Sequence, residues 1–489
     1  MVMRVGGLAT GMDIESMVNK LMEAERIPLT KMEQNRTELT WKRDAYRDLN
    51  RGLLELDELM NTMKRPSTYR SKLVTSSQEQ SVTASSTSSA SNGAYNIEVS
   101  QLASAATNVS QAKLSIDPDK SLKELGIEQE LIKFSTVNND GETVEHEVKI
   151  DESDSLKDVL SKITKADNDV RAFYDDQSEK VILETTRTGQ YNEDGAEISF
   201  DKENAFWETL NLDPSQEKGG TNAIFTYNDA VDLESKDNVY SLNGITFQFH
   251  SVTDGKATLN IANDVESTFE SIIKFVDKYN DVVEKLNESQ LEEKHRDYEP
   301  LTEEQKKEMS EDEIKKWEEK VKSGILRGET TISGGLYAMR SGWYSKVETG
   351  GELKFLTQIG INTSKDYMDG GKLIVDEEQL RKAISEDPDG VEKLFINSSD
   401  DESRGLVHRL SDSVKDTMGK IERSAGKSTH TLDNYTIGKE MKNLNERITA
   451  FEAKMVRIEN RYWNQFTQME KAIQRMNDQS EQLLSQFGG

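Results

Sequence analysis

Both ends of the chain carry apolar residues spaced alternately three and four positions apart. The first series is interrupted by two polar residues, Asn35 and Lys42, and consists otherwise of Met32, Leu39, Tyr46, Leu49, Leu53, Leu56, Met60 and Met63. The second consists of Met441, Leu444, Ile448, Phe451, Met455, Ile458, Tyr462, Phe466, Met469, Ile473, Met476, Ser480, Leu483 and Phe487. This spacing is typical of the contact line, or seam, of a coiled coil. Two successive steps of four, from Ile458 to Phe466, relax the supercoil locally.

A single helix cannot bury such a seam, so each end needs a helical partner. We expect the two ends to pair with one another, which brings the termini together; independent dimerisation of each end is the alternative. A shorter amphipathic segment precedes the first seam, with Asp13 as its N-cap and Ile14, Val18 and Leu21 on one face. Pro28 disfavours helix at Ile27, which predicts a break at 27–29.

The charge of the chain is unevenly distributed. The full chain of 489 residues has 62 basic and 90 acidic side chains and a net charge of −28. Residues 1–65 and 432–489 are each balanced, at 11 against 11 and 8 against 8, so the middle holds the whole excess. An acidic surface repels polyanions and anionic lipids, which argues against nucleic acid as a partner. The neutral ends therefore fit an assembly surface. We expect no membrane insertion, because no stretch approaches ~18 consecutive apolar residues.

In the middle of the chain the hydrophobic period changes from 3.6 to 2. Strands are predicted around Tyr95–Val99, Leu131–Val137, Thr143–Ile150, Val181–Thr185, Ile245–His250 and Ala257–Ile261, with a hairpin turn at Asn139–Gly141. Thr75–Ser91 holds 11 Ser or Thr in 17 positions, typical of a linker or a polar edge strand. Short helices are predicted around Leu156–Ile163 and Phe206–Leu212.

Helical patterns return after the strands. A seam runs through Val265, Phe269, Ile272, Val276, Tyr279, Val283 and Leu286. Capping boxes begin at Thr302 and Ser310, Gly324 is placed to end the second of these helices, and a hairpin is expected at Ile359–Val375. Further helices are predicted near 377–396 and 402–422.

The predicted fold class is therefore α+β, with paired terminal helices and a helical bundle forming a stalk and two strand-rich lobes inserted between them. The expected parts are a leg (1–42 and 432–489), a bundle (43–70 and 264–431), an inner lobe (71–128 and 222–263) and an outer lobe (129–221).

No catalytic or metal-binding pattern stands out. The chain has no cysteine, and its five histidines are dispersed without the i, i+4 spacing of a helical metal site. The glycines near the start lack the lysine of a phosphate loop. Methionine recurs on the terminal seams, either as ordinary filler or as a surface that tolerates shifting registers. We expect no enzyme, no cofactor and no metal.

Several segments resemble the flagellar filament cap proteins, the FliD family. The opening segment Gly7–Met22 with Ile27-Pro-Leu29 is similar to the start of that family. Further similar segments are Gly93–Ala103, Gly220–Phe225, Phe275–Asn280, Pro300–Leu326 and Gly371–Asp376, in the same order and spacing. The region from about 110 to 220 is similar only loosely and should vary most.

The resemblance implies a homo-oligomeric cap at the distal tip of the extracellular filament, exported by the flagellar type III apparatus. It also implies flagellin and hook–filament junction proteins as partners, and a cytoplasmic export chaperone that binds around Asn464–Phe487. The absence of both cysteine and a cleaved signal peptide fits such a route. A flagellin-like or junction-type hook-associated protein is the first alternative, and a secreted adhesin or glycan-processing enzyme that uses the lobes is the second.

Overall fold

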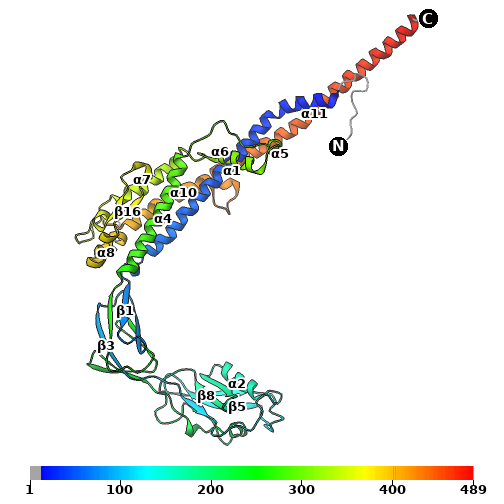
Figure 1. Ribbon diagram of the computed structural model, residues 1–489. Coiled ribbons are helices and arrows are strands. Elements are labelled where there is room, and N and C mark those ends of the chain that lie inside the picture. The colour runs from blue at the N-terminus through cyan, green and yellow to red at the C-terminus, as the bar shows by residue number, and fades with distance from the viewer. Residues whose placement is uncertain (1–12, 400, 402, 488–489) are drawn as a thin grey trace. The chain divides into compact units, whose positions relative to one another are not determined.

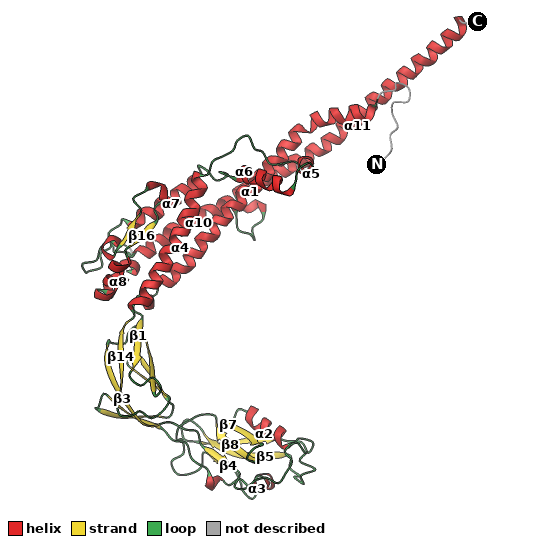
Figure 2. Ribbon diagram, in the orientation of Figure 1, coloured by secondary structure: helices red, strands yellow, loops and turns green. Residues whose placement is uncertain are grey.

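The computed structural model describes residues 13–399, 401 and 403–487 (Figure 1). The glycine-rich start discussed above lies outside them. The chain divides into two compact units, one made of Met1–Tyr69 with Glu266–Gly489 and the other of Arg70–Val265. The first unit is almost entirely helical and the second is rich in strands (Figure 2), which confirms the α+β fold class.

The helical unit is built on three long helices and several shorter ones. Its helices are α1 (Ile14–Met63), α4 (Val265–Leu291), α5 (Glu303–Lys307), α6 (Glu311–Lys322), α7 (Thr330–Trp343), α8 (Glu377–Glu386), α9 (Pro388–Ile396), α10 (Leu406–Ala425) and α11 (Thr436–Phe487). The predicted hairpin forms from β15 (Ile361–Thr363) and β16 (Leu373–Val375), which pair antiparallel. Asn280 on α4 fixes it by exchanging two hydrogen bonds with the backbone of Leu373.

The capping predictions for this unit are confirmed. The Asp13 side chain accepts from Ser16 N at 2.9 Å, and both expected capping boxes are present, at Thr302 and at Ser310. Gly324 follows α6 with φ +66°, where an added Cβ would lie 2.9 Å from Lys294 N. The helix therefore ends where the sequence places its glycine.

The prediction of a break at Pro28 is wrong. α1 continues as one helix from Ile14 to Met63 with Pro28 inside it. Proline at this position removes one backbone donor, but the apolar side chains before it pack in a cluster with α11, and α1 stays beside α11 after it. Tertiary contact with α11 therefore outweighs the local cost. The inward face of the first turns is also shifted, since Met22 is buried and Leu21 is 39% exposed.

The second unit contains two separate hydrophobic cores. The first belongs to a five-stranded antiparallel sheet, in the order β1 (Lys72–Ser76), β14 (Ala257–Asn263), β3 (Gly93–Gln101), β10 (Ala223–Tyr227), β11 (Val231–Ser235). It is completed by a three-stranded sheet in the order β12 (Val239–Leu242), β13 (Ile245–Phe249), β2 (Val82–Ser86). β1 and β2 are edge strands, so the Ser/Thr-rich segment contains polar edge strands and is not a linker.

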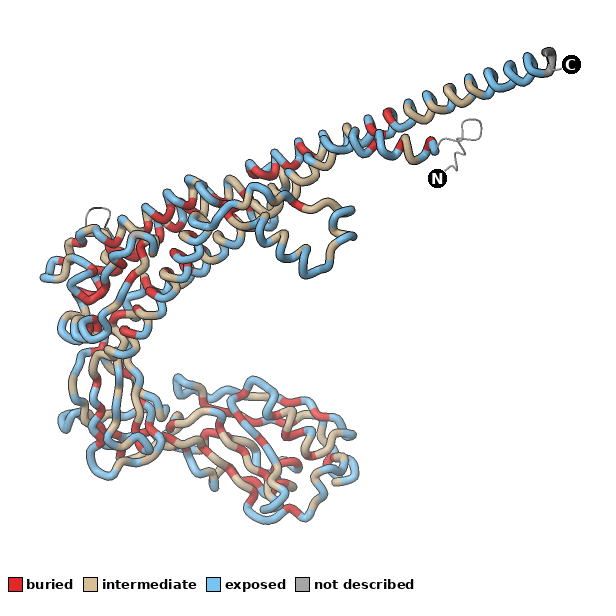
Figure 3. Tube along the Cα trace, turned by 45° about the horizontal axis from the view of Figure 1, so that its top comes forward, coloured by how far each residue is buried: buried red, intermediate tan, exposed pale blue. Residues whose placement is uncertain are grey.

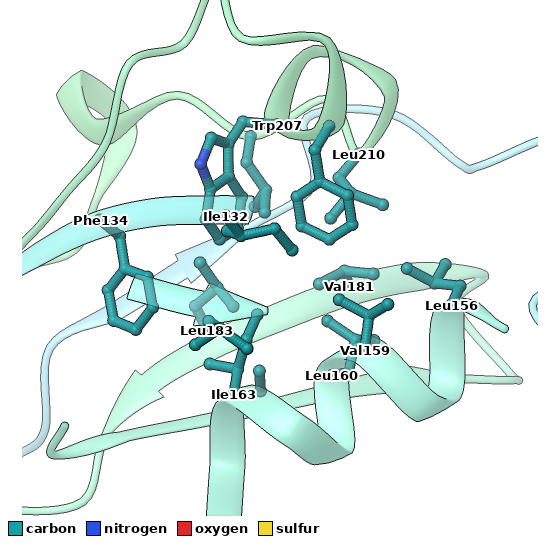
Figure 4. Close-up of a cluster of buried hydrophobic side chains, with 14 of the residues drawn as sticks. Ile132, Phe134, Leu156, Val159, Leu160, Ile163, Val181, Leu183, Trp207 and Leu210 are labelled. Atoms are coloured by element: carbon teal, nitrogen blue, oxygen red, sulfur yellow. The ribbon is translucent and has the colours of Figure 1, made fainter. Parts of the chain in front are cut away.

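The second core is enclosed by residues 107–212. Its sheets have the orders β4 (Thr107–Val109), β8 (Lys180–Thr185), β7 (Val170–Asp175) and β6 (Thr143–Lys149), β5 (Leu131–Val137), β9 (Ile198–Ser199). The helices α2 (Leu156–Lys165) and α3 (Ala205–Thr209) cover it. Trp207 is 1% exposed in this core and lies opposite the apolar face of α2, with Val181 and Leu183 between them (Figure 4).

The expected boundary between the lobes near residue 128 is wrong. Leu114, Leu122 and Ile127 pack in the second core, and β4 pairs with β8. The first core takes its residues from Val82–Ala103 and Ala223–Ile261. The segment after Ala106 therefore belongs to the second core, because its apolar residues are buried there even though they lack a regular strand pattern.

Candidate assembly site

The start of α1 packs antiparallel against the middle of α11. Ile14, Val18 and Met22 form one buried cluster with Met455 and Ile458, and Met17, Phe451, Tyr462, Trp463 and Phe466 pack around it. The Tyr462 hydroxyl donates to Glu25 Oε1 at 2.9 Å. Pairing of the two ends within one chain, the arrangement expected from their seams, is therefore present in the structure.

The pairing of α1 with α11 ends near Arg47. The Arg47 guanidinium donates to the carbonyls of Ala425, Gly426 and Lys427 and lies 5.5 Å from the centre of the Tyr435 ring. These carbonyls lie at the end of α10 and just after it, where a cation is favourable. Because α11 begins at Thr436, it has no residues to place beside the later turns of α1.

The later part of the first seam instead lies beside α10. Tyr46, Leu53, Leu56, Met60 and Met63 are fully buried, whereas Met32, Leu39 and Leu49 are half-buried. Ser411 on α10 links to α1 by accepting from Lys64 Nζ and donating to Asp57 Oδ1. The expectation that the whole first seam packs against the second is therefore wrong. The first part of this continuous apolar pattern lies beside α11 and the later part lies beside α10.

A polar contact lies on α1 near the point where its partner changes from α11 to α10. Glu329, the N-cap residue of α7, accepts from the Tyr46 hydroxyl at 2.7 Å and pairs with Lys42. Burial opposes ionisation of Glu329, but the hydrogen bonds from Lys42 and Tyr46 outweigh it and lower the pKa of the carboxyl. Burial, together with the bond to Glu329, raises the pKa of Tyr46. Lys42, a polar interruption of the seam, thus has a defined partner.

The residues of the second seam differ in burial along α11. Met441, Leu444, Ile448, Met455 and Ile458 are buried, and Phe451, Phe466, Met469 and Ile473 are half-buried. Met476 and Leu483 are 66% and 54% exposed, and Leu484, which the seam did not include, is 70% exposed. Figure 3 shows this change toward the C-terminal end of α11. The Phe487 side chain lies outside the described residues.

We call residues 467–484 of α11 the bare segment. α1 begins at Ile14, whose cluster reaches only to Phe466 on α11, so the described part of α1 offers nothing to cover this stretch. An apolar stripe of this kind on a long helix is typical of a surface that binds another helix. Among the described residues, this stretch thus exposes the apolar side chains of Met476, Leu483 and Leu484.

The sequence pattern did not assign the first turns of α1 to either seam, although they contact α11. Met17 and Met22 belong to the cluster on α11, and Trp463 packs beside it. The amphipathic pattern of Ile14 and Val18 was the available signal, but the expected break at Pro28 separated it from the seam that follows.

No reactive centre emerges from the described residues. Within them, no group of three His, Asp or Glu side chains is arranged to hold a metal ion. His146 is hydrogen-bonded to Thr136 at 2.8 Å, and burial lowers its pKa. In the same part of the chain, no helix is long and apolar enough to cross a membrane.

Comparison with known proteins identifies the family. Residues 10–106 match the family model described as flagellar hook-associated protein 2 N-terminus, and residues 220–478 match the one described as flagellar hook-associated protein 2 C-terminus. The segment between these matches is nearly the same as the chain that builds the second core. This fits the expectation that the region from about 110 to 220 departs most from the family.

Individual relatives agree with the family models. The flagellar hook-associated protein 2 of Halalkalibacterium halodurans is 36% identical over 99% of this chain and 100% of its own length. The B-type flagellar hook-associated protein 2 of Pseudomonas aeruginosa is 25% identical, covering 92% of both chains.

A solved structure shares the fold. The D1-D2-D3 domains of the flagellar cap protein FliD from Escherichia coli superpose with a TM-score of 0.56 at 19% identity, covering 78% of this chain and 99% of that one. The two family models, the full-length relative and the paired terminal helices lead to one conclusion: the chain belongs to the flagellar hook-associated protein 2 family, the FliD filament cap proteins.

Proposed function

We propose that this chain caps the distal end of the flagellar filament, where it promotes the folding and insertion of flagellin and prevents loss of subunits. The observation that supports a contact role for the terminal helices is the bare segment of α11, where Met476, Leu483 and Leu484 are exposed in a chain of the cap family. The segment would contact subunits at the filament end. The chain would act as a structural protein and not as an enzyme.

The chemistry of the bare segment suits repeated binding and release. Its exposed apolar side chains include Met476, and methionine adapts to neighbours of different shape. Each insertion of a subunit requires the contact to break and form again, so no single interaction should dominate. Several moderate apolar contacts along a helix meet this requirement better than one buried ion pair does.

Further partners follow from the same proposal. Before export, a cytoplasmic chaperone would cover the region Asn464–Phe487, since an exposed apolar helix invites aggregation. Export would use the flagellar type III apparatus. At the hook, junction proteins would hold the first cap, and further copies of this chain would complete it.

The proposal is tested by adding the purified chain to filaments that lack a cap and measuring growth from added flagellin. The triple variant Met476→Glu/Leu483→Glu/Leu484→Glu should lose growth support at least tenfold while its circular dichroism and melting of the helical unit stay unchanged. The matched control is Ile374→Glu, which alters a residue 57% exposed on β16. Full growth with the triple variant would reject the role of the bare segment.

A further inference from the structure

The two polar interruptions of the first seam coincide with an open groove between α1 and α11. The groove runs from Pro28 to Lys42 on α1 and from Lys439 to Lys454 on α11. Asn35 and Asn443 both line it, so polar side chains stand where a packed apolar layer would otherwise close the seam. Apolar side chains contribute to its wall: Met32, Leu39, Leu444 and Phe451.

The groove carries positive charge in a strongly acidic protein. Five basic and two acidic side chains line it, whereas the whole chain has a net charge of −28. Lys31 and Lys42 are neutralised by Glu299 and Glu329. Among the described residues, the three basic side chains on α11 make no ion pair: these are Lys439, Arg447 and Lys454. The groove therefore offers unneutralised cations beside apolar surface.

In the described chain, a face of α4 carries unpaired acidic side chains, the opposite charge to that of the groove. Glu270, Asp277, Asp281 and Glu288 are exposed and spaced seven, four and seven residues apart, which places them on one side of the helix. They line the furrow between α1 and α4, together with apolar residues such as Ile273 and Leu59. Nine acidic and five basic side chains line this furrow in all, so its balance is acidic. Within the described part of the chain, these four carboxylates have no ion-pair partner.

The two surfaces match in length and in charge spacing. At 1.5 Å per residue, Lys439 to Lys454 spans about 22 Å and Glu270 to Glu288 about 27 Å. Arg447 and Lys454 are about 10 Å apart along α11, as are Glu270 and Asp277 along α4. Opposite charges at such spacing steer and orient an encounter between two helical surfaces.

We propose that the basic groove between α1 and α11 of one copy binds the acidic face of α4 of a second copy. This contact deepens the proposed function, which requires several copies to form the cap. It joins two different surfaces of the two copies. When only one such contact forms between two copies, each keeps one groove or one face available for the next, and repetition builds a ring or an open chain of subunits.

The test measures self-association of the full chain by sedimentation velocity over a range of concentrations and salt. The variant Lys439→Glu/Arg447→Glu and the variant Glu270→Lys/Asp277→Lys should each raise the dissociation constant at least tenfold. An equimolar mixture of the two variants should associate again, because the reversed groove of one meets the reversed face of the other. Association of the parent chain should weaken as salt is raised.

Lys382→Glu is the matched control, since it reverses an exposed charge on α8 outside both surfaces and should associate like the parent. Circular dichroism checks that every variant is folded. A monomeric parent chain, a groove variant that associates normally, or a mixture that stays monomeric would each overturn the proposal. Capping is assayed separately on filaments, so a chain that associates as described but fails to cap would count against the proposed function alone.

Discussion

Glu329 couples two side chains of α1 to the start of α7 and gives a pH-dependent contact. Its pKa lies below the ordinary 4.5 in the folded protein. The folded state therefore binds fewer protons than the unfolded state as pH falls past 4.5. The stabilisation is present above the unfolded pKa and is lost as pH falls through the folded pKa.

We predict that Glu329→Gln lowers the free energy of unfolding of the helical unit by about 1 kcal/mol at pH 7, because it removes the charge paired with Lys42. The difference from the parent should shrink toward zero as the pH is lowered below about 4. Urea titrations at both pH values measure it. Tyr46→Phe, which keeps the ion pair and removes one hydrogen bond, is the comparison; an equal gap for Glu329→Gln at pH 7 and below pH 4 would contradict the assignment.

At the scale of single residues, the sequence predicts which seam positions are buried better than it predicts the exact direction in which a side chain faces. The apolar spacing correctly identified Leu53, Leu56 and Met60 as buried. It chose Leu21 where Met22 is buried, because adjacent residues on a helix differ by only 100° and either fits a loose pattern. It treated Lys42 as an interruption, since its partner Glu329 is distant in sequence and only the fold brings them together.

At the scale of elements, we predict opposite effects on stability for alanine substitutions at two neighbouring glycines of α7. A Cβ on Gly335 would lie 2.6 Å from Thr417 Cγ2 on α10, whereas one on Gly334 would meet nothing within 4 Å. Gly335→Ala should destabilise the helical unit by about 1–3 kcal/mol through overpacking. Gly334→Ala should stabilise it by about 0.5–1 kcal/mol, because alanine favours helix. Thermal or denaturant unfolding measures both, and a similar sign for the two variants would refute the close approach of α7 and α10.

Replacing Pro28 measures how much a proline inside α1 destabilises the helical unit. Pro28 supplies no N–H for the carbonyl four residues earlier, yet the helix continues through it. Pro28→Ala should raise the free energy of unfolding of the helical unit by about 1–3 kcal/mol, as measured in urea. Ile27→Ala, at a site 67% exposed in the same turn, should change it little. No gain from Pro28→Ala would mean that the helix is already adapted to the proline.

Elements with a strong period were predictable and those defined by tertiary contacts were not. The seam at 265–286, the strands β5 and β6 and the capping boxes follow from short-range patterns. Residues 107–128 lack such a pattern. Their place in the second core depends on three scattered side chains, Leu114, Leu122 and Ile127, which only a folded chain brings into one cluster.

At the scale of the whole molecule, the second core is formed by an insertion between β3 and β10 of the first core. Thr107 and Lys218 exchange backbone hydrogen bonds of 2.8 and 2.9 Å, so the ends of the insertion lie side by side. Joining Ala106 to Gly219 through Asn-Gly should leave the first core and the helical unit folded, because all of their strands and helices lie outside 107–218.

Hydrogen exchange of β3 and β14 and thermal melting of the helical unit measure the outcome. Removing 223–235 instead, which takes away β10 and β11, should unfold the first core and serves as the contrast. Loss of β3 protection in the shortened chain would show that the two cores depend on each other. Residues 107–218 lie between the matches to the two family models. An assay of the shortened chain on filaments therefore also tests whether the cap function requires this region.

The division of the chain also sets the order in which a nascent molecule can mature. The strand-rich unit is one uninterrupted stretch, whereas the helical unit needs residues from both extremities. α1 must wait for α10 and α11, which are synthesised some 340 residues later, and such distant contacts form slowly. Closure of the helical unit is thus expected to follow folding of the strand-rich unit, and a binder that holds α11 would delay that closure.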